Sequence, residues 1–169
     1  KFWNTITWSN LGPPLYTGPQ LAGINLGTAV VSIALNPQMQ PTVAHVEDVG
    51  GVRSVKVSGY DSQSSTWILA GAKKASGDSP AGEPSITVIE GLAYVAFVES
   101  GVNGTYVQVR RFAENTWQRV GAPIAAPQGT VPKAPYLVGI GKLPYVAFRQ
   151  PDGNGIDRVW VAAFAPPAP

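Results

Sequence analysis

The feature that most constrains this chain is an internal repeat of about 52 residues that occurs three times. Each copy holds a run of β-branched and aromatic residues followed by a Val-x-Val run. The paired runs are Pro41–Glu47 with Val55–Val57, Ala93–Glu99 with Val107–Val109, and Pro144–Arg149 with Val159–Val161. The first valines of the Val-x-Val runs are 52 and 52 residues apart. A fixed period of this kind indicates three copies of one supersecondary unit.

A second marker, Trp-x-x-x-Gly, follows the first and second repeats, at residues 67–71 and 117–121. The third repeat has no such marker after it, whereas residues 8–12 carry one before the first repeat begins. The two ends of the chain are therefore complementary. We expect Phe2–Leu11 to supply the fourth strand of the last repeat, which would remove two exposed sheet edges.

Each unit is predicted to form four short strands, because its runs are rich in β-branched and aromatic residues and are bounded by Gly and Pro. The Trp-bearing segment is the fourth strand. Between the second and third strands lie Gly50–Gly51, Asn103–Gly104 and Asn154–Gly155, for which we expect type I′ hairpin turns. No segment has the pattern of an amphipathic helix. The sequence therefore predicts an all-β protein.

Four-stranded repeats of this length resemble β-propeller blades. The run Leu-Pro-Tyr-Val-Ala-Phe at 143–148, followed by an alternating strand, together with Trp-x-x-x-Gly, is similar to kelch-type and related surface-propeller repeats. The double glycine of kelch repeats is absent at the expected strand end, and the Gly-His and Trp-Asp markers of WD40 repeats are absent too, so no family is assigned. The resemblance implies propeller blades with an N-terminal strand closing the last blade. The alternative is a β-trefoil, which also has three four-stranded repeats.

We expect residues 1–164 to form a single repeat domain, with repeats at about 13–71, 72–121, and 122–164 plus 1–12. Residues 165–169 are predicted to be a proline-rich tail or linker stub. Three blades are fewer than the roughly 4–8 of most propellers. We therefore expect a homo-oligomer, in which a dimer makes six blades, or a piece of a larger propeller.

Composition excludes several kinds of chemistry. The 169 residues include no cysteine and one histidine, so disulfides, a thiol nucleophile, thiolate zinc sites and multi-histidine metal sites are ruled out, and no cofactor is expected. The formal charge is +2, and the densest basic spots are the pairs Lys73–Lys74 and Arg110–Arg111. Without a basic stripe we expect no nucleic-acid partner. Without an apolar run of ~18 residues we expect no membrane span.

Four residues are predicted to bind a ligand: Trp3, Tyr106, Trp160 and His45. Trp3, Tyr106 and Trp160 do not recur with the repeat, so the packing of the repeats does not require them. His45 takes the place that phenylalanine holds in the other repeats. The recurring tryptophans of the Trp-x-x-x-Gly segments are interpreted instead as packing between neighbouring sheets.

Two further motifs suggest sites. Asp152, Asn154 and Asp157 resemble the start of a calcium loop, although the later bidentate acid is missing and an Asn-Gly hairpin explains most of the pattern. Asn103 begins an N-glycosylation sequon, Asn-Gly-Thr, on a predicted exposed turn.

The function predicted from these features is a non-enzymatic module, outside the cell or on its surface, that recognises carbohydrate or a protein partner. One alternative is a structural building block of an extracellular assembly. Another is a carbohydrate-active hydrolase or lyase, which would use acids close to the turns as a pair of catalytic carboxylates. The candidate acids are Glu47, Asp48, Glu99 and Asp152.

Overall fold

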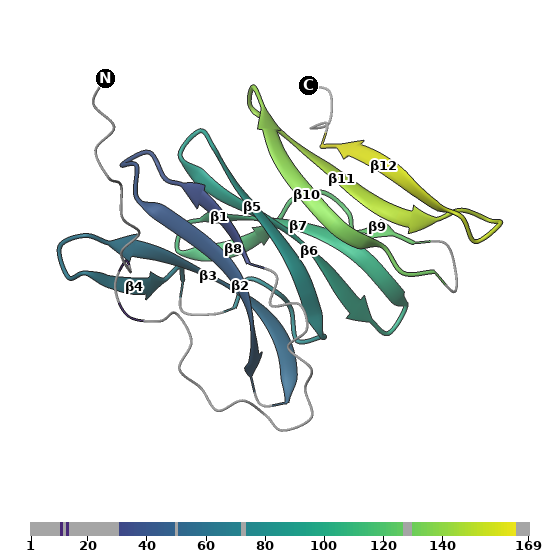
Figure 1. Cartoon of the computed structure of the whole chain (residues 1–169), viewed down its shortest axis with the longest axis horizontal. Helices are drawn as coiled ribbons and strands as arrows, with labels where there is room; N and C mark the ends of the chain where they lie inside the picture. The colour runs from purple at the N-terminus through teal and green to yellow at the C-terminus, as the bar shows by residue number, and fades with distance from the viewer. Residues whose placement is uncertain are drawn as a thin grey trace, which may run out of the picture.

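The computed structural model describes residues 11, 13, 31–49, 51–71, 74–126 and 130–164. Within these residues twelve strands form three antiparallel sheets, and there is no helix (Figure 1). The first sheet holds β1 (Ser32–Leu35), β2 (Pro41–Val49), β3 (Val52–Asp61) and β4 (Thr66–Leu69). The second holds β5 (Ala81–Ile89), β6 (Leu92–Gly101), β7 (Gly104–Ala113), β8 (Thr116–Arg119) and β9 (Ile124–Ala125). The third holds β10 (Lys133–Ile140), β11 (Leu143–Pro151) and β12 (Asp157–Ala163).

The all-β prediction is confirmed, and the repeats correspond to the sheets. Strands pair with their neighbours in chain order within each sheet, and the described strands do not form the single closed barrel of the trefoil alternative. The number of strands differs from the four predicted for every repeat. The second sheet gains β9, which pairs with β7, and the third sheet has three strands in the described part of the chain. The predicted closing strand and the tail at 165–169 lie outside the described residues.

Adjacent sheets meet through their first strands in the same way each time. The backbone N–H of Ile86 donates to Ser32 Oγ at 3.0 Å, and the N–H of Leu137 donates to Ser85 Oγ at 2.9 Å. Figure 1 shows the second sheet between the first and the third. The sequence repeat is thus also a repeat of the junction between sheets.

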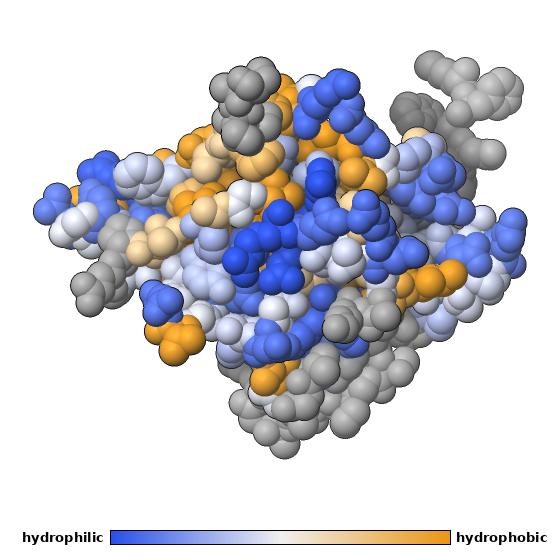
Figure 2. Space-filling model, turned by 180° about the vertical axis from the view of Figure 1, so that it is seen from behind, coloured by the Kyte–Doolittle hydropathy of each residue, from blue (hydrophilic) through white to orange (hydrophobic). Residues whose placement is uncertain are grey.

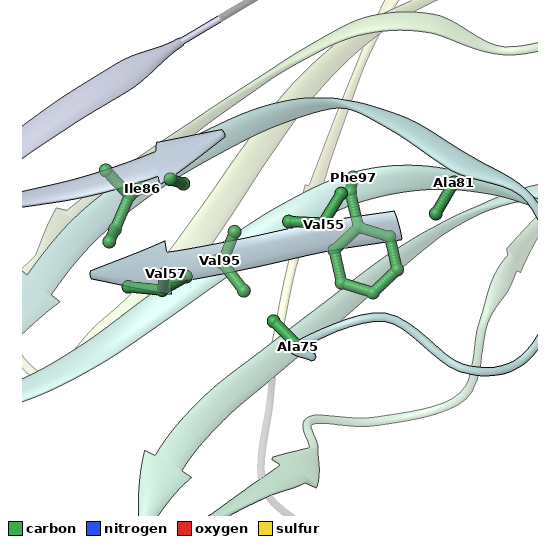
Figure 3. Packing of buried hydrophobic residues seen from close by; sticks show 8 residues of the cluster. Val55, Val57, Ala75, Ala81, Ile86, Val95 and Phe97 are labelled. Carbon is green, nitrogen blue, oxygen red and sulfur yellow. The ribbon is translucent and has the colours of Figure 1, made fainter. Parts of the chain in front are cut away.

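The core is divided between these two junctions. At the first junction, Val55 and Val57 of β3 pack with Ile86 of β5 and with Val95 and Phe97 of β6 (Figure 3). At the second junction the corresponding valines of β7 pack with Leu137 and Val146 of the third sheet. Each fully buried side chain of this size contributes about 1.5–3 kcal/mol relative to exposure, so the apolar faces hold neighbouring sheets together.

The turn prediction was wrong for Asn103–Gly104 and for Asn154–Gly155, where Asn154 has no positive φ. Gly101 pairs with Gly104, so the central turn residues are Val102 and Asn103, and neither has a positive φ. Both central residues have positive φ instead in the turns at 90–91 (49° and 80°) and 114–115 (52° and 57°). Type I′ geometry therefore occurs where Glu occupies the first position, which a search for Asn-Gly cannot find.

No helix in the described part of the chain is long and apolar enough to cross a membrane.

Candidate functional site

A hollow of about 630 Å³ lies between the first and second sheets. It is lined by strands β3, β4, β7 and β8 and by residues 71 and 74–78, which follow the first sheet. Its polar side chains are Lys56, Lys74, Ser76, Asp78, Arg110, Asn115 and Thr116, and Trp117 adds a large aromatic ring. The hollow therefore combines three cations, one carboxylate, an amide, two hydroxyls and one large aromatic ring.

Trp117 forms a rigid wall of this hollow. It lies on β8 opposite Phe112 of β7, and the two ring centroids are 5.2 Å apart. Its indole Nε1–H donates to the backbone oxygen of Ala70 at 3.0 Å, across the junction between the sheets. Because the polar end of the indole is already bound, Trp117 offers the hollow a fixed carbon surface.

Arg110 of β7 carries a charge held in a partly buried place. Its Nη2 is 4.0 Å from Glu99 Oε2, and its guanidinium carbon lies 5.9 Å from the centroid of the Phe97 ring. Burial lowers the pKa of Arg110, and the charge of Glu99 opposes that effect. The Nε of Arg110 is buried and has no hydrogen-bond partner in the described structure. Arg110 is thus a charged group with an unused donor.

Glu99 lies behind Arg110 and is almost completely buried. One of its oxygens accepts the backbone N–H of Gly77 at 2.8 Å, and the other accepts the hydroxyl of Tyr106 at 3.3 Å. Burial raises the pKa of the Tyr106 hydroxyl, and the charge and hydrogen bond of Glu99 raise it further. Glu99 therefore ties three segments together and helps to position Arg110 rather than lining the hollow.

A second carboxylate, the partly buried Glu47, holds Lys56. Lys56 Nζ is 2.5 Å from Glu47 Oε2, and His45 Nε2 is 2.8 Å from Glu47 Oε1. Burial alone would raise the pKa of Glu47, but hydrogen bonds from Lys56 and His45 and the charges of both groups hold that pKa below its usual value. Glu47 therefore stays ionised and fixes the position of Lys56.

The charges around the hollow are balanced. The three cations each have a carboxylate within 4.0 Å, and the third such pair is Lys74 with Asp78 at 3.4 Å. A group of hydrogen-bond donors without a large excess of positive charge suits a ligand rich in hydroxyl groups better than a polyanion.

The residues predicted from sequence to bind a ligand do not come together. His45 is buried behind Lys56, and Tyr106 contacts Glu99 behind Arg110, so both support the hollow from outside its lining. Trp160 lies exposed on β12, opposite Phe148 in the third sheet. Trp3 lies outside the described residues.

The calcium candidate stays a prediction. Both carboxylate oxygens of Asp152 are engaged: Oδ1 accepts the N–H groups of Asn154 and Ile156, and Oδ2 accepts Arg158 Nε at 3.0 Å. These hydrogen bonds, the one from Ile156 first, lower the pKa of Asp152. Asp157 begins β12. No group of three or more His, Cys, Asp or Glu side chains in the described chain could hold a metal ion.

The glycosylation candidate also stays a prediction. Asn103 lies in the exposed turn between β6 and β7. This placement is compatible with a glycan.

Sequence reasoning missed the hollow, although one signal pointed to it. The two densest basic spots, Lys73–Lys74 and Arg110–Arg111, each contribute one lining residue. These two residues, Lys74 and Arg110, are distant in sequence but line the same hollow. The sequence interpretation of Trp117 as a packing residue agrees with its contact across the two sheets, where its indole N–H binds the oxygen of Ala70. That interpretation leaves out that the Trp117 ring also forms part of the wall of the hollow.

Comparisons with known proteins give matches of fold alone. No family model matches the chain, and no curated protein matches its sequence. A thermostable family-43 glycoside hydrolase matches with a TM-score of 0.50 and 13% identity, over 82% of this chain and 59% of its own. A fucose lectin from Kordia zhangzhouensis, solved in complex with methyl-fucoside, matches with a TM-score of 0.51 and 12% identity, over 79% of this chain and 92% of its own. An endo-1,4-beta-xylanase from Bacteroides thetaiotaomicron matches with a TM-score of 0.48 and 12% identity.

The prediction that the chain is not an enzyme was wrong. The structure shares its β-rich fold with a glycoside hydrolase as well as with a lectin, and it spans 59% of the length of that hydrolase. The sequence argument excluded chemistry that needs cysteine or several histidines, whereas glycoside hydrolysis needs only two carboxylates. This fold therefore does not separate binding modules from enzymes.

Proposed function

We propose that this protein binds a neutral saccharide in the hollow between its first and second sheets. The observation that carries the proposal is the combination of one rigid indole wall with convergent, charge-balanced donors. A volume of about 630 Å³ is within the range of roughly 300–1,000 Å³ of small-molecule sites.

The two kinds of group match the two kinds of surface on a sugar ring. Trp117 offers an apolar surface for the C–H face of the ring, and its position is set by Phe112 and by Ala70. Arg110, Lys56 and Lys74 donate to hydroxyl oxygens, and such charge-assisted bonds are about twice as strong as neutral ones. The paired carboxylates keep the field of these cations short-ranged, which favours a neutral ligand.

The fold comparison supports the same class of ligand. The lectin that binds methyl-fucoside is covered over 92% of its length, so its whole fold is comparable with this chain. Carbohydrate is the partner class that we propose. A location outside the cell or on its surface is part of the proposal, because such saccharides are displayed there.

The first experiment is an array of neutral and acidic oligosaccharides, with methyl-fucoside included, followed by calorimetric titration of the strongest neutral hit. Lys74→Ala and Thr116→Ala remove lining groups without touching the buried core. We expect each to weaken binding, by roughly tenfold for Lys74→Ala, which corresponds to about 1.4 kcal/mol. Lys142→Ala, an exposed lysine of the third sheet, is the matched control and should bind as the unmodified protein does.

Three outcomes contradict the proposal. One is the absence of binding to any saccharide, and another is a preference for acidic saccharides that salt abolishes. A third is loss of binding in Trp160→Ala with unchanged binding in Lys74→Ala, which moves the site to β12. Reducing ends are measured in the same samples, because their release from the bound saccharide would show hydrolysis in addition to binding.

A further inference from the structure

Both ends of the row of sheets leave uncovered the faces that the repeats bury elsewhere. Val55, Val57 and Val107 are 0% exposed and Val109 is 9% exposed, whereas Val159 and Val161, at the same positions of the third repeat, are 72% and 69% exposed. Figure 2 shows hydrophobic side chains exposed beside a hydrophilic centre on the face opposite to Figure 1. The third sheet thus ends in an apolar surface without a neighbour in the described structure.

On the first sheet the exposed apolar face is that of its first strand, β1, whereas on the third sheet it is that of the last strand, β12. Ile33 is 65% exposed, but Ile86 and Leu137, which pair with the equivalent valines of their sheets, are 5% and 4% exposed. At each junction the residue at this position, Ile86 or Leu137, packs against the Val-x-Val face of the preceding sheet. The Ile33 face of one copy therefore matches the Val159–Val161 face of another.

An apolar hollow of about 350 Å³ lies between the second and third sheets. Phe164 lines it, 52 residues after Phe112 in the sequence. In the first two sheets the aromatic residue at this position packs against a tryptophan: Tyr60 on Trp67 at 5.3 Å between centroids, and Phe112 on Trp117 at 5.2 Å. Among the described residues Phe164 has no such tryptophan partner.

The walls of this hollow repeat the surroundings of Trp117. A Cβ on Gly71 would lie 2.9 Å from Phe112, and one on Gly121 would lie 3.2 Å from Phe164, so the same glycine–aromatic contact recurs. Ala70, which accepts the indole N–H of Trp117, corresponds to Val120, which also lines the hollow. The hollow therefore repeats the walls that surround Trp117 at the first junction, and Val120 stands at the position of its hydrogen-bond acceptor.

We propose that residues 8–12 of a second copy of this chain fill the hollow and pair with β12, and that two copies exchange these segments to form a ring of six sheets. Trp8 packs against Phe164 and donates its indole N–H to the oxygen of Val120. Each copy thus completes the last sheet of the other, and the Ile33 face of each covers the Val159–Val161 face of its partner.

The order of segments and sheets along the chain favours a second copy over the same chain. Gly71 precedes Ile86 by 15 residues, and Gly121 precedes Leu137 by 16, and each of these connections leads to the next sheet. Gly12 precedes Ile33 by 21 residues, which is close to one such step. In the proposed ring, residues 8–12 lie beside the open face of their own first sheet, where the third sheet of the other copy is placed.

The experiment uses the absence of cysteine from the chain. In the register of β7 with β8, Phe112 pairs with Trp117 and Arg111 with Gln118, so pairing Phe164 with Trp8 places Ala163 opposite Ser9. Chains carrying only Ser9→Cys and chains carrying only Ala163→Cys are co-expressed and oxidised. Directly opposed strand residues meet the distance limits of a disulfide. Glu114→Cys, in an exposed turn of the second sheet, replaces Ala163→Cys in the control.

We expect a mass of twice 17.7 kDa by light scattering and a disulfide-linked dimer in the Ser9 with Ala163 mixture, absent with Glu114. Trp8→Ala should shift the mass to that of the monomer. If that variant does not fold, the cross-link still decides, because it leaves Trp8 in place. A monomeric mass overturns the proposal, as does a dimer without the mixed cross-link. A chain carrying both cysteines that forms the bond only within itself also overturns it, since the segment then closes its own sheet.

Discussion

Replacing Glu99 by Gln removes a buried charge while keeping the size of the side chain. Glu99 is 2% exposed and accepts hydrogen bonds from Gly77 and Tyr106, with Arg110 4.0 Å away. A hydrogen bond to a charged group contributes about 1.5–3 kcal/mol and a neutral one about 0.5–1.5, so each of the two bonds loses roughly 1 kcal/mol. Arg110 also loses its counter-charge. The expected loss in the free energy of unfolding is about 2–3 kcal/mol.

Urea denaturation at neutral pH measures this loss. An unchanged slope of the free energy of unfolding against urea concentration would show that the variant exposes the same surface area on unfolding. The corresponding fall in Tm is roughly 5–10 °C for a chain of this size. Glu90→Gln is the matched control, because Glu90 is an exposed carboxylate that pairs with Lys142 at the surface. A destabilisation of Glu99→Gln no larger than that of the control would refute the role assigned to Glu99.

Three further predictions concern the same junction. Trp117→Phe keeps an aromatic ring but removes the inter-sheet hydrogen bond, and calorimetry should show a loss of about 1–2 kcal/mol in stability. The pKa of Glu47 is lowered in the fold, so ionised Glu47 stabilises the folded state fully at neutral pH, and this contribution is lost as the pH falls below about 4.5. The difference in Tm between the unmodified protein and Glu47→Gln should therefore shrink over that range. Gly71→Ala forces a side chain at φ 83° and against Phe112, and thermal unfolding should show a loss of about 1–3 kcal/mol. The same substitution at Gly104, where φ is 111° but the space is open, should cost less.

The repeat made the architecture predictable to the level of whole strands. The register that pairs Ile86 with Val95 is repeated by Leu137 with Val146, because similar hydrophobic patterns at a fixed spacing bury the same faces. The turns were less predictable. Glu90 and Glu114 adopt positive φ because two-residue hairpins impose it, and sequence preference alone does not reveal such positions.

The candidate site was hidden because its parts come from two repeats. Lys74 follows the first sheet and Arg110 belongs to the second, and only the packing of β3 and β4 against β7 and β8 brings them to one hollow. Trp160 attracted attention because it departs from the repeat, but at the same position Lys56 lines the hollow and Gln108 is buried. The environment of a repeat position depends on which sheet covers it, and sequence does not contain that information directly.

Backbone and side-chain NMR of the ¹⁵N-labelled protein, titrated with the strongest neutral saccharide from the array, tests the saccharide site most directly. We predict that the largest shifts will occur at Arg110, Thr116 and Trp117, which line the hollow. Signals of Trp160 on β12 should stay unchanged. Saturable shifts at Trp160 with unmoved signals of Arg110 and Trp117 would contradict the assignment of the hollow as the binding site.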